Sequence, residues 1–390
     1  MTPRELLRRL LRRPAGDWAG PDGAGKAARA ALPLERDDAF DIVVFPDEFP
    51  PDDPLLRPLT EARHRVFRAP FSIVGGKPIE NLDELRREHR LGATIVLRRG
   101  PRDAALADLP ERLGWTILRV DGTEDVGELP AKMRDAFPLV SIVIVTCDNL
   151  DLNRLCLESL FARTEWPRYE VIVVDNGSTD GTAELLASLA AGHENLRVVA
   201  FRENRGFPAA VNAGLADARG DPLVVLNNDT VLTRGWLTGL RRHLLADPRL
   251  GLVGPTTNAI ANEARVDAGY ADVGELPRWA AEWCRAHDGE TAEISMLAFF
   301  CVAIRRRTFE EVGPLDERFG LGLFEDGDYN RRVRQRGWTA RCARDVFVHH
   351  WQNASFRRLG RDAYFALYEE NRRKFEEKWG EPPGSPSASA

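Results

Sequence analysis

The chain has 390 residues, 43% of them hydrophobic and 29% charged, which is ordinary for a globular protein of about two domains. A formal net charge of −6 argues against a general nucleic-acid-binding protein, which needs a basic surface. The five cysteines are scattered and form no CxxC pair, so we expect neither a disulfide framework nor a zinc knuckle, and a cytoplasmic location fits. No stretch approaches the roughly 20 apolar residues that span a bilayer.

Residues 1–37 are predicted to form a basic N-terminal segment and a linker. Pairs of leucines and arginines alternate between residues 6 and 13, without the features of a signal peptide. Two interpretations remain open: a basic helix lying on the anionic inner face of a membrane, or a solvated helix docked on the protein itself. The stretch Gly20–Lys26 resembles a P-loop, but no strand precedes it, so we reject a phosphate loop here.

Residues 38–137 are predicted to form a small α/β domain of unknown role. We expect strands at Phe40–Phe45, Arg65–Phe67, Ala93–Leu97 and Trp115–Val120, and helices at Asp53–His64 and Asn81–His89. No polar cluster recurs at the ends of these strands in the sequence, so we expect a structural or partner-binding role. The region Pro130–Pro138 is the predicted domain boundary.

Strands and helices alternate in the next domain, residues 138–360, which is typical of a sheet built from right-handed βαβ units. The predicted strands are Ser141–Thr146, Glu170–Asp175, Leu196–Phe201, Pro222–Leu226 and Gly251–Gly254. Open α/β sheets bind ligands at the carboxyl ends of their strands, and polar side chains follow four of these strands. They are Thr146 and Asp148, Asp175 and Asn176, Asn204 and Arg205, and the triplet Asn227, Asn228 and Asp229.

The later part of this domain contains an apolar run, a hinge and an acidic helix start. The apolar run is Ser295–Ile304, the hinge is Gly320–Gly322, and Phe324-Glu-Asp-Gly-Asp328 opens a helix. The last strand is predicted at Arg341–His350. Residues 361–380 are predicted to form an amphipathic closing helix, and residues 381–390 a disordered tail.

In this order the motifs resemble the inverting family 2 glycosyltransferases, over roughly residues 141–355. Val171–Gly181 is similar to the family's second-strand signature, whereas the usual Thr-Tyr-Asn after the first strand is altered to Thr146-Cys-Asp148. Asn227-Asn-Asp229 falls at the DxD-type metal motif, Phe324-Glu-Asp326 at the acidic pair, and His350 at a late histidine. The resemblance implies the GT-A fold, a Rossmann-like mixed sheet.

The resemblance also implies a nucleotide-diphosphate sugar donor, a saccharide or lipid-linked saccharide acceptor, and a role in bacterial surface polysaccharides such as O-antigens. The residues expected to bind the donor are Thr146, Asp148, Asp175, Asn176, Asn204, Arg205, Gly206, Asn212, Asn227, Asn228 and Asp229.

Asp229 is a hard oxygen ligand, suited to hold Mg²⁺ or Mn²⁺ against a diphosphate whose developing charge must be neutralised. Asn227 replaces the first carboxylate of a DxD, and the resemblance implies that His350 contributes as a second metal ligand; a structural histidine at the end of a strand is the alternative. A plain turn is the structural alternative for the triplet. Asp175 is expected to bind the base, whereas for Asp148 helix capping is an equal alternative to binding.

Inverting transfer needs a carboxylate that takes the proton of the acceptor hydroxyl. Glu325, Asp326 and Asp328 gather at one helix start, where mutual repulsion would raise one pKa and the helix dipole would oppose the rise. We predict Asp326 as the base and Glu325 as the residue that orients the acceptor. A merely charged first helical turn is the alternative. For Arg305–Arg307 the alternatives are an anionic lipid-diphosphate contact and a solvated charge run.

Two other functions are compatible with these motifs. The first is a binding or scaffold protein that has the fold without turnover, as the substitution at Asn227 suggests. The second is a sugar-nucleotide nucleotidyltransferase. That enzyme would need a Gly-rich basic loop after the first strand, and Thr146–Asn149 is not such a loop.

Overall fold

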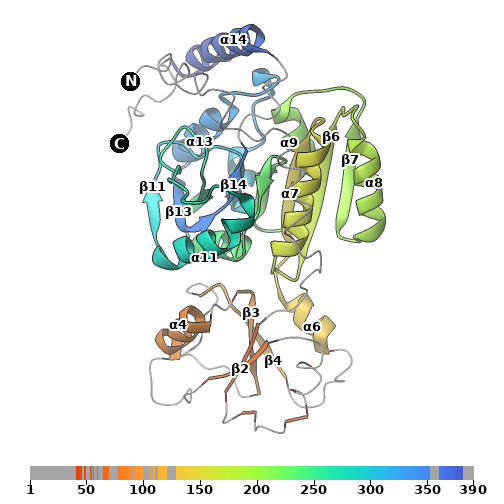
Figure 1. The fold of residues 1–390 in the computed structure, drawn as a ribbon. Coiled ribbons are helices and arrows are strands. Elements are labelled where there is room, and N and C mark those ends of the chain that lie inside the picture. Colours follow the sequence, from red (N-terminus) through yellow and green to blue (C-terminus); the bar gives the residue numbers. More distant parts are fainter. Residues whose placement is uncertain are drawn as a thin grey trace.

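The computed structural model describes residues 129–351 and 360–380 continuously, and shorter segments between residues 41 and 120. The predicted basic N-terminal segment, most of the predicted helix Asp53–His64 and the predicted tail lie outside the described residues. Figure 1 shows a small sheet-containing unit next to a larger α/β unit, with helix α14 (Arg361–Trp379) at the end farthest from the small unit. In the described part, no helix is both long enough and apolar enough to cross a membrane.

The small unit contains a parallel sheet of four strands in the order β2–β1–β3–β4. The strands are β1 (Asp41–Val44), β2 (Arg65–Arg68), β3 (Thr94–Arg98) and β4 (Thr116–Arg119). Helix α4 (Pro78–His89) follows β2, and α6 (Leu129–Ala136) leads into the larger unit. The four predicted strands and the second predicted helix are therefore confirmed.

Charged side chains from distant parts of the chain meet at the carboxyl end of β3. The guanidinium of Arg98 binds the carboxylate of Glu48 at 2.7–3.0 Å. Arg99 Nη1 lies 2.5 Å from Asp53 Oδ2. Each acid lies more than 40 positions before its arginine, so no local pattern reveals the pairs.

The larger unit is built on an eight-stranded mixed sheet in the order β11–β13–β10–β12–β8–β5–β6–β7. Strands β8, β5, β6 and β7 run parallel, whereas β12 runs antiparallel between β10 and β8. The bounds are β5 Val140–Thr146, β6 Tyr169–Asn176, β7 Leu196–Phe201, β8 Leu223–Asn227, β10 Leu250–Thr256, β11 Thr291–Glu293, β12 Cys301–Ile304 and β13 Thr339–Phe347. Two short strands, β9 (Thr230–Val231) and β14 (His349–His350), pair beside the sheet.

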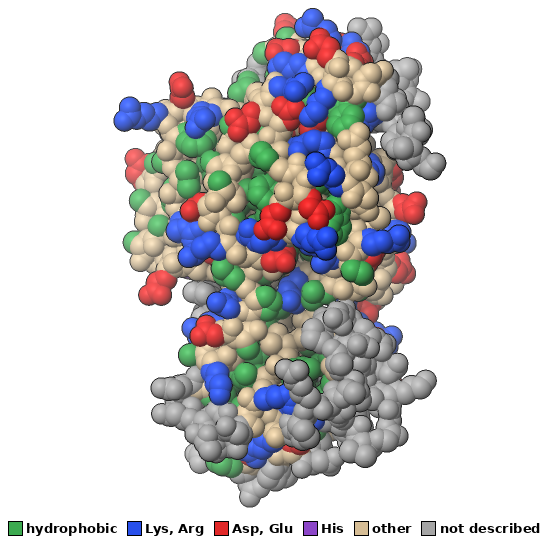
Figure 2. All heavy atoms as spheres, turned by 180° about the vertical axis from the view of Figure 1, so that it is seen from behind, with side chains coloured by type: hydrophobic (Ala, Val, Ile, Leu, Met, Phe, Trp, Pro, Cys, Tyr) green, Lys and Arg blue, Asp and Glu red, His purple; other side chains and the backbone are tan. Residues whose placement is uncertain are grey.

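Helices cover both faces of this sheet, as its runs of Val, Ile and Leu predict. Helices α7, α8 and α10 contribute to the core on one face, and α9 and α13 to the core on the other. The bounds are α7 Leu150–Arg163, α8 Thr182–Gly192, α9 Phe207–Asp217, α10 Trp236–Ala246, α11 Leu276–Ala286, α12 Arg306–Val312 and α13 Glu325–Gln335. Seen from behind in Figure 2, acidic and basic side chains are interspersed over the larger unit.

One predicted strand and the apolar run before it are arranged as follows. Only the last four residues of the apolar run Ser295–Ile304 form a strand, because Phe299 and Phe300 are buried against α13 and His350 instead. The last predicted strand begins earlier, at Thr339, and it is interrupted before His349.

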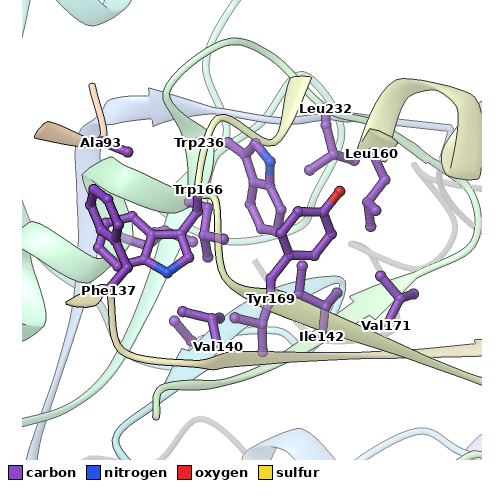
Figure 3. Packing of buried hydrophobic residues seen from close by; sticks show 14 of the residues in the cluster. Ala93, Phe137, Val140, Ile142, Leu160, Trp166, Tyr169, Val171, Leu232 and Trp236 are labelled. Carbon is purple, nitrogen blue, oxygen red and sulfur yellow. The ribbon is translucent and has the colours of Figure 1, made fainter. Parts of the chain in front are cut away.

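Aromatic packing connects the two units. Phe137 meets Trp166 edge to face at 4.9 Å, and Figure 3 shows both beside Ala93 of the small unit and Trp236 of α10. The indole of Trp166 donates to the carbonyl of Pro138 at 2.9 Å. One hydrophobic core therefore continues from the small sheet into the larger one.

A buried ionic network crosses the same boundary. Arg86 of α4 binds both carboxylate oxygens of Asp288 at 3.0 and 2.7 Å, and Arg242 of α10 binds Asp288 and Asp345. The carboxylate of Asp345 also lies 2.6 Å from His243 Nε2. The network joins the small unit to the larger one through two acids on the larger unit.

We expect Asp345→Ala to lower the free energy of unfolding by about 3–5 kcal/mol, because it removes the buried acid that binds both His243 and Arg242 and leaves Arg242 with Asp288 alone. Denaturant unfolding measures this change. Glu293→Ala removes an exposed partner of Arg341 and is the matched control, for which we expect a change below about 1 kcal/mol. If both variants lost a similar free energy of unfolding, the ionic network would not be what stabilises this boundary.

Candidate active site

The carboxyl ends of β5, β6 and β8 meet at one edge of the sheet. Thr146 is in register with Asp175, and Val145 with Asn227. The polar residues that the sequence predicts after these strands therefore lie side by side, where open α/β sheets bind ligands.

Some of these side chains are used inside the protein. The hydroxyl of Thr146 donates to Asn153 Oδ1 at 2.7 Å, and the amide of Asn228 donates to the same oxygen. Asn153 in turn donates to Thr182 at 2.9 Å. Thr146, Asn153 and Asn228 are buried, so this network fixes α7 against the strand ends. No role was predicted for Asn153 from the sequence, although a single amide side chain among the leucines of a buried helix indicates a buried hydrogen-bond network.

Asp148 and Asp175 organise the loop that follows β6. Asp175 accepts a hydrogen bond from the Ser178 amide at 3.0 Å, and Asp148 accepts one from the Thr179 amide at 2.6 Å. The capping alternative for Asp148 is not supported, because Asp180 Oδ2 accepts from the first amide of α7, that of Leu150, at 2.9 Å. Asp180 is a second structural residue that the sequence reasoning missed.

The third polar motif packs against the loop that precedes α13. Asn176 donates to Asn204 at 2.9 Å and accepts from the Arg205 amide at 2.8 Å, while the Arg205 guanidinium stacks on Phe201 at 4.7 Å. Gly206 has φ 89°, and a Cβ there would lie 2.0 Å from the carbonyl oxygen of Gly320. Only glycine allows this approach.

Asn212 of α9 holds the same loop further upstream. Its amide nitrogen donates to the carbonyl of Leu315, and its oxygen accepts from the Leu315 amide, at 2.9 and 2.8 Å. It also donates to Glu317 at 2.9 Å. Gly206 and Asn212 thus contact the segment that leads to Glu325 and Asp326.

Asp229 and His350 form a pair at the end of β8. His350 Nε2 lies 3.2 Å from Asp229 Oδ1, and its Nδ1 lies 3.0 Å from the carbonyl of Ala259. A carbonyl only accepts, so Nδ1 carries the proton and Nε2 faces Asp229. Burial lowers the pKa of His350, but the neighbouring Asp229 carboxylate outweighs burial and the net shift is upward. The ring also stacks on Phe300 at 4.8 Å.

This pair fits a divalent cation that the protein holds with few ligands. Within the described residues no group of three or more His, Cys, Asp or Glu side chains is placed to hold a metal. Mg²⁺ is commonly bound by one or two carboxylates together with substrate phosphates, so a third acidic ligand is not required. The Oδ1 atom of Asn227 is buried without a hydrogen-bond partner among the described residues, which leaves it available to a ligand.

The three carboxylates at the start of α13 have different environments. Asp328 is fully buried and binds Arg332, Trp379 and Lys378 at 2.9, 3.0 and 2.5 Å, so its role is structural. Glu325 is buried, and its Oε2 has no hydrogen-bond partner among the described residues. Burial, followed by repulsion from Asp326, raises the pKa of Glu325 to about 8, and burial raises the pKa of Asp326 to about 6.

Contacts place α13 at the same edge of the sheet as Asp229. Asn330 exchanges hydrogen bonds with the backbone of Leu297 at 3.0 and 2.8 Å. Phe299 meets Tyr329 of α13 at 5.4 Å, while the next residue, Phe300, stacks on His350. The segment 297–300 lies at the carboxyl end of β8, because Cys301 pairs with Leu226 in the antiparallel sense. In Figure 1, α13 and β14 accordingly lie close together.

The remaining candidates have internal partners. Arg305 donates to the carbonyls of Leu250 and Asp247, Arg306 to that of Gly220, and Arg307 to Glu311. His349 Nδ1 lies 2.6 Å from the Tyr270 hydroxyl, and burial lowers the pKa of His349 to about 3. These contacts give the arginines a structural role and do not support the proposed lipid-diphosphate contact.

Glu325→Gln should stabilise the protein at alkaline pH. The folded protein favours the protonated form of Glu325, because its pKa is raised from 4.5 to about 8. This contribution to the free energy of unfolding is therefore fully present below about pH 4.5 and is lost as the pH rises to about 8. Glutamine keeps the shape without the charge, so we expect its Tm to exceed that of the wild type by a few degrees at pH 9 and to match it at pH 5. Thermal unfolding tests this against Glu310→Gln, an exposed control. A difference in Tm between Glu325→Gln and the wild type that is the same at pH 5 and pH 9 would contradict the raised pKa of Glu325.

Polar and acidic side chains gathered at the carboxyl edge of an α/β sheet are typical of a ligand site. Comparison with known proteins identifies the family. The chain belongs to glycosyl transferase family 2, whose profile matches residues 141–313. Glycosyltransferase AglE of Haloferax volcanii is 34% identical over 224 residues, which cover 56% of this chain and 68% of the relative.

Two further relatives are less similar. The N-acetylglucosaminyl-diphospho-decaprenol L-rhamnosyltransferase of Mycobacterium tuberculosis is 29% identical over 233 residues, covering 53% of this chain and 73% of the relative. The O-antigen biosynthesis protein RfbC of Myxococcus xanthus is 29% identical over 237 residues, covering 56% of this chain but only 18% of that longer relative. The predicted family and the GT-A fold class are thus confirmed. The matched profile includes Asp229 but ends before Glu325 and His350.

Proposed function

We propose that the protein transfers a sugar from a nucleotide-diphosphate donor to a hydroxyl of a saccharide or lipid-linked saccharide acceptor, with inversion at the anomeric carbon. The observation that supports this best is the placement of two acidic groups beside one segment. Asp229 faces His350, which stacks on Phe300, and the helix that begins with Glu325 and Asp326 is bound to Leu297 and Phe299. In this proposal the donor diphosphate and the acceptor meet between these two acidic groups.

The donor would lie along the strand ends. Asp175 and the loop after β6 are suited to the base and ribose, because backbone amides and carboxylates there are already ordered by hydrogen bonds. Asp229 and His350 would hold Mg²⁺ or Mn²⁺, with Asn227 as a neutral neighbour. A cation bound there would neutralise the charge that develops on the departing diphosphate.

Asp326 would take the proton of the attacking hydroxyl. Its pKa near 6 leaves it ionised at neutral pH and yet basic enough to accept a proton in the transition state. Glu325, with a pKa near 8, would keep its proton and donate a hydrogen bond to the acceptor. The two carboxyl groups thus receive different roles from their surroundings.

The named relatives favour a role in polysaccharide or glycan biosynthesis. One relative is named for transferring L-rhamnose to a diphospho-decaprenol-linked sugar, and another for O-antigen biosynthesis. A lipid-linked saccharide is therefore the acceptor class to test first. We place the reaction in the cytoplasm, at the inner face of the membrane if residues 1–13 bind anionic lipid.

The test is donor turnover. The purified protein is incubated with UDP-, GDP- and dTDP-sugars, with Mn²⁺ or with EDTA, and release of the nucleotide diphosphate is measured with and without saccharide acceptors. The proposal expects one donor class to be turned over, faster with Mn²⁺ and with acceptor. The substitution at Asn227 favours the second candidate, a binding protein without turnover, which would bind a donor and release nothing. Family membership gives no support to the nucleotidyltransferase alternative.

A further inference from the structure

The C-terminal helix α14 binds the turn that presents the two catalytic carboxylates. Asn371 is fully buried on this helix. Its amide nitrogen donates to three backbone carbonyls, those of Phe319 and Gly322 at 2.7 Å and that of Leu323 at 3.3 Å. One side chain of α14 therefore holds the backbone up to two residues before Glu325.

The turn itself is in an unfavourable conformation. Leu323 and Phe324 have φ values of 76° and 75°, in the left-handed region that costs a residue with a side chain about 1–2 kcal/mol. Two such residues in succession persist only where the surroundings impose them, and they are found mainly at functional sites. The strained pair directly precedes Glu325 and Asp326, so it sets the direction in which the first turn of α13 presents both carboxylates.

Helix α14 also contacts the chain on both sides of this turn. Upstream, Lys374 donates to the carbonyl of Arg318 at 2.8 Å. Downstream, Lys378 and Trp379 bind the buried carboxylate of Asp328. Phe375 of α14 lies against Gly327, where a Cβ would come within 3.4 Å of its ring.

The same loop also contacts the third polar motif and helix α9. Gly206 approaches the carbonyl of Gly320, and Asn212 binds the backbone of Leu315. The loop 315–324 is thus held between the third polar motif and α14. Without the bonds from α14, the strained turn would relax while the donor residues on the strands stayed in place.

We propose that Asn371 is a positioning residue, which holds the turn Leu323–Phe324 in the conformation that directs Glu325 and Asp326 toward the acceptor. The inference rests on the glycosyl transfer proposed for this site. It assigns α14 a part in the reaction rather than only in stability. A misplacement of about 1 Å at a reacting group can cost about 10²-fold in rate.

The experiment compares Asn371→Asp, Asn371→Ala and the control Arg373→Ala. Aspartate keeps the shape of asparagine but removes the donating NH₂ group, and Arg373 is exposed on the same helix. We expect both Asn371 variants to lower kcat by about 10- to 100-fold with an unchanged donor KM, and the control to match the wild type. If the Asn371 variants fail to fold, Lys374→Met serves as the test instead. It removes a peripheral hydrogen bond to the same loop and should lower kcat by a smaller factor.

Hydrogen–deuterium exchange separates this inference from the proposed function. Amides 319–328 should exchange faster in the Asn371 variants, whereas amides 170–230 should not change. An unchanged kcat, or a donor KM that rises as much as kcat falls, would overturn the positioning role, as would unchanged exchange at 319–328. If the wild-type protein transfers no sugar, the proposed function fails, and the exchange measurement still decides whether Asn371 holds the turn.

Discussion

Asp326→Asn is expected to lower the rate of sugar transfer by about 10²–10⁴-fold and to leave donor binding unchanged. Asparagine has the shape of aspartate but cannot accept the proton of the acceptor hydroxyl. The wild-type rate should rise as the pH increases through about 6, because Asp326 is a base only when it has lost its proton. The variant should show no such rise. Steady-state kinetics between pH 5 and 8 measures both effects.

Asp362→Asn is the matched control, since it makes the same chemical change at an exposed carboxylate in the first turn of α14. It should keep the wild-type rate and pH profile. If Asp326→Asn retains more than about a tenth of the wild-type rate, Asp326 is not the base. If Glu325→Gln then shows the large loss, the two carboxyl groups have exchanged roles.

Asp229→Ala is expected to remove the dependence on Mn²⁺ and to lower the transfer rate by about 10²–10³-fold. The reason is that Asp229 is the acidic side chain placed beside His350 Nε2, where the diphosphate charge would be neutralised. Removing metal from the wild type with EDTA should reproduce the loss. Calorimetric titration of Mn²⁺ in the presence of UDP, GDP or dTDP measures the binding step separately.

Asn227→Asp is the informative counterpart, because it restores the carboxylate that the DxD-type motif has at its first position. It should bind Mn²⁺ more tightly than the wild type, since a buried oxygen without a hydrogen-bond partner gains a charge. Persistence of full Mn²⁺ stimulation in Asp229→Ala would exclude Asp229 as a metal ligand.

The sequence predicts much of the fold because the strands are continuous runs of β-branched residues. Ile142–Val145 and Val171–Val174 are buried along their whole length, as such runs indicate. Polar residues directly after them also locate the ligand edge, because the carboxyl ends of parallel strands coincide. The apolar run Ser295–Ile304 is a strand only in its last four residues, whereas Phe299 and Phe300 are apolar because they pack against Tyr329 and His350.

The contacts that hold the site together could not be predicted, because they join residues far apart in the chain. Asn371 binds carbonyls about fifty positions upstream, and Arg86 binds Asp288 about two hundred positions downstream. Asp328 looks like a third catalytic carboxylate in the sequence, yet burial with Lys378 and Trp379 makes it structural. Short-range patterns carry no information on such partners.

The most direct test of the account is a crystal structure with Mn²⁺ and the nucleotide diphosphate that binds best. The proposed reaction requires that Asp229 and Asp326 face one crevice. We predict an anomalous Mn²⁺ peak coordinated by Asp229, His350 and the diphosphate, with the Asp326 carboxylate open toward the same crevice. A peak bound elsewhere, or a diphosphate separated from Asp326 by the protein core, would contradict it.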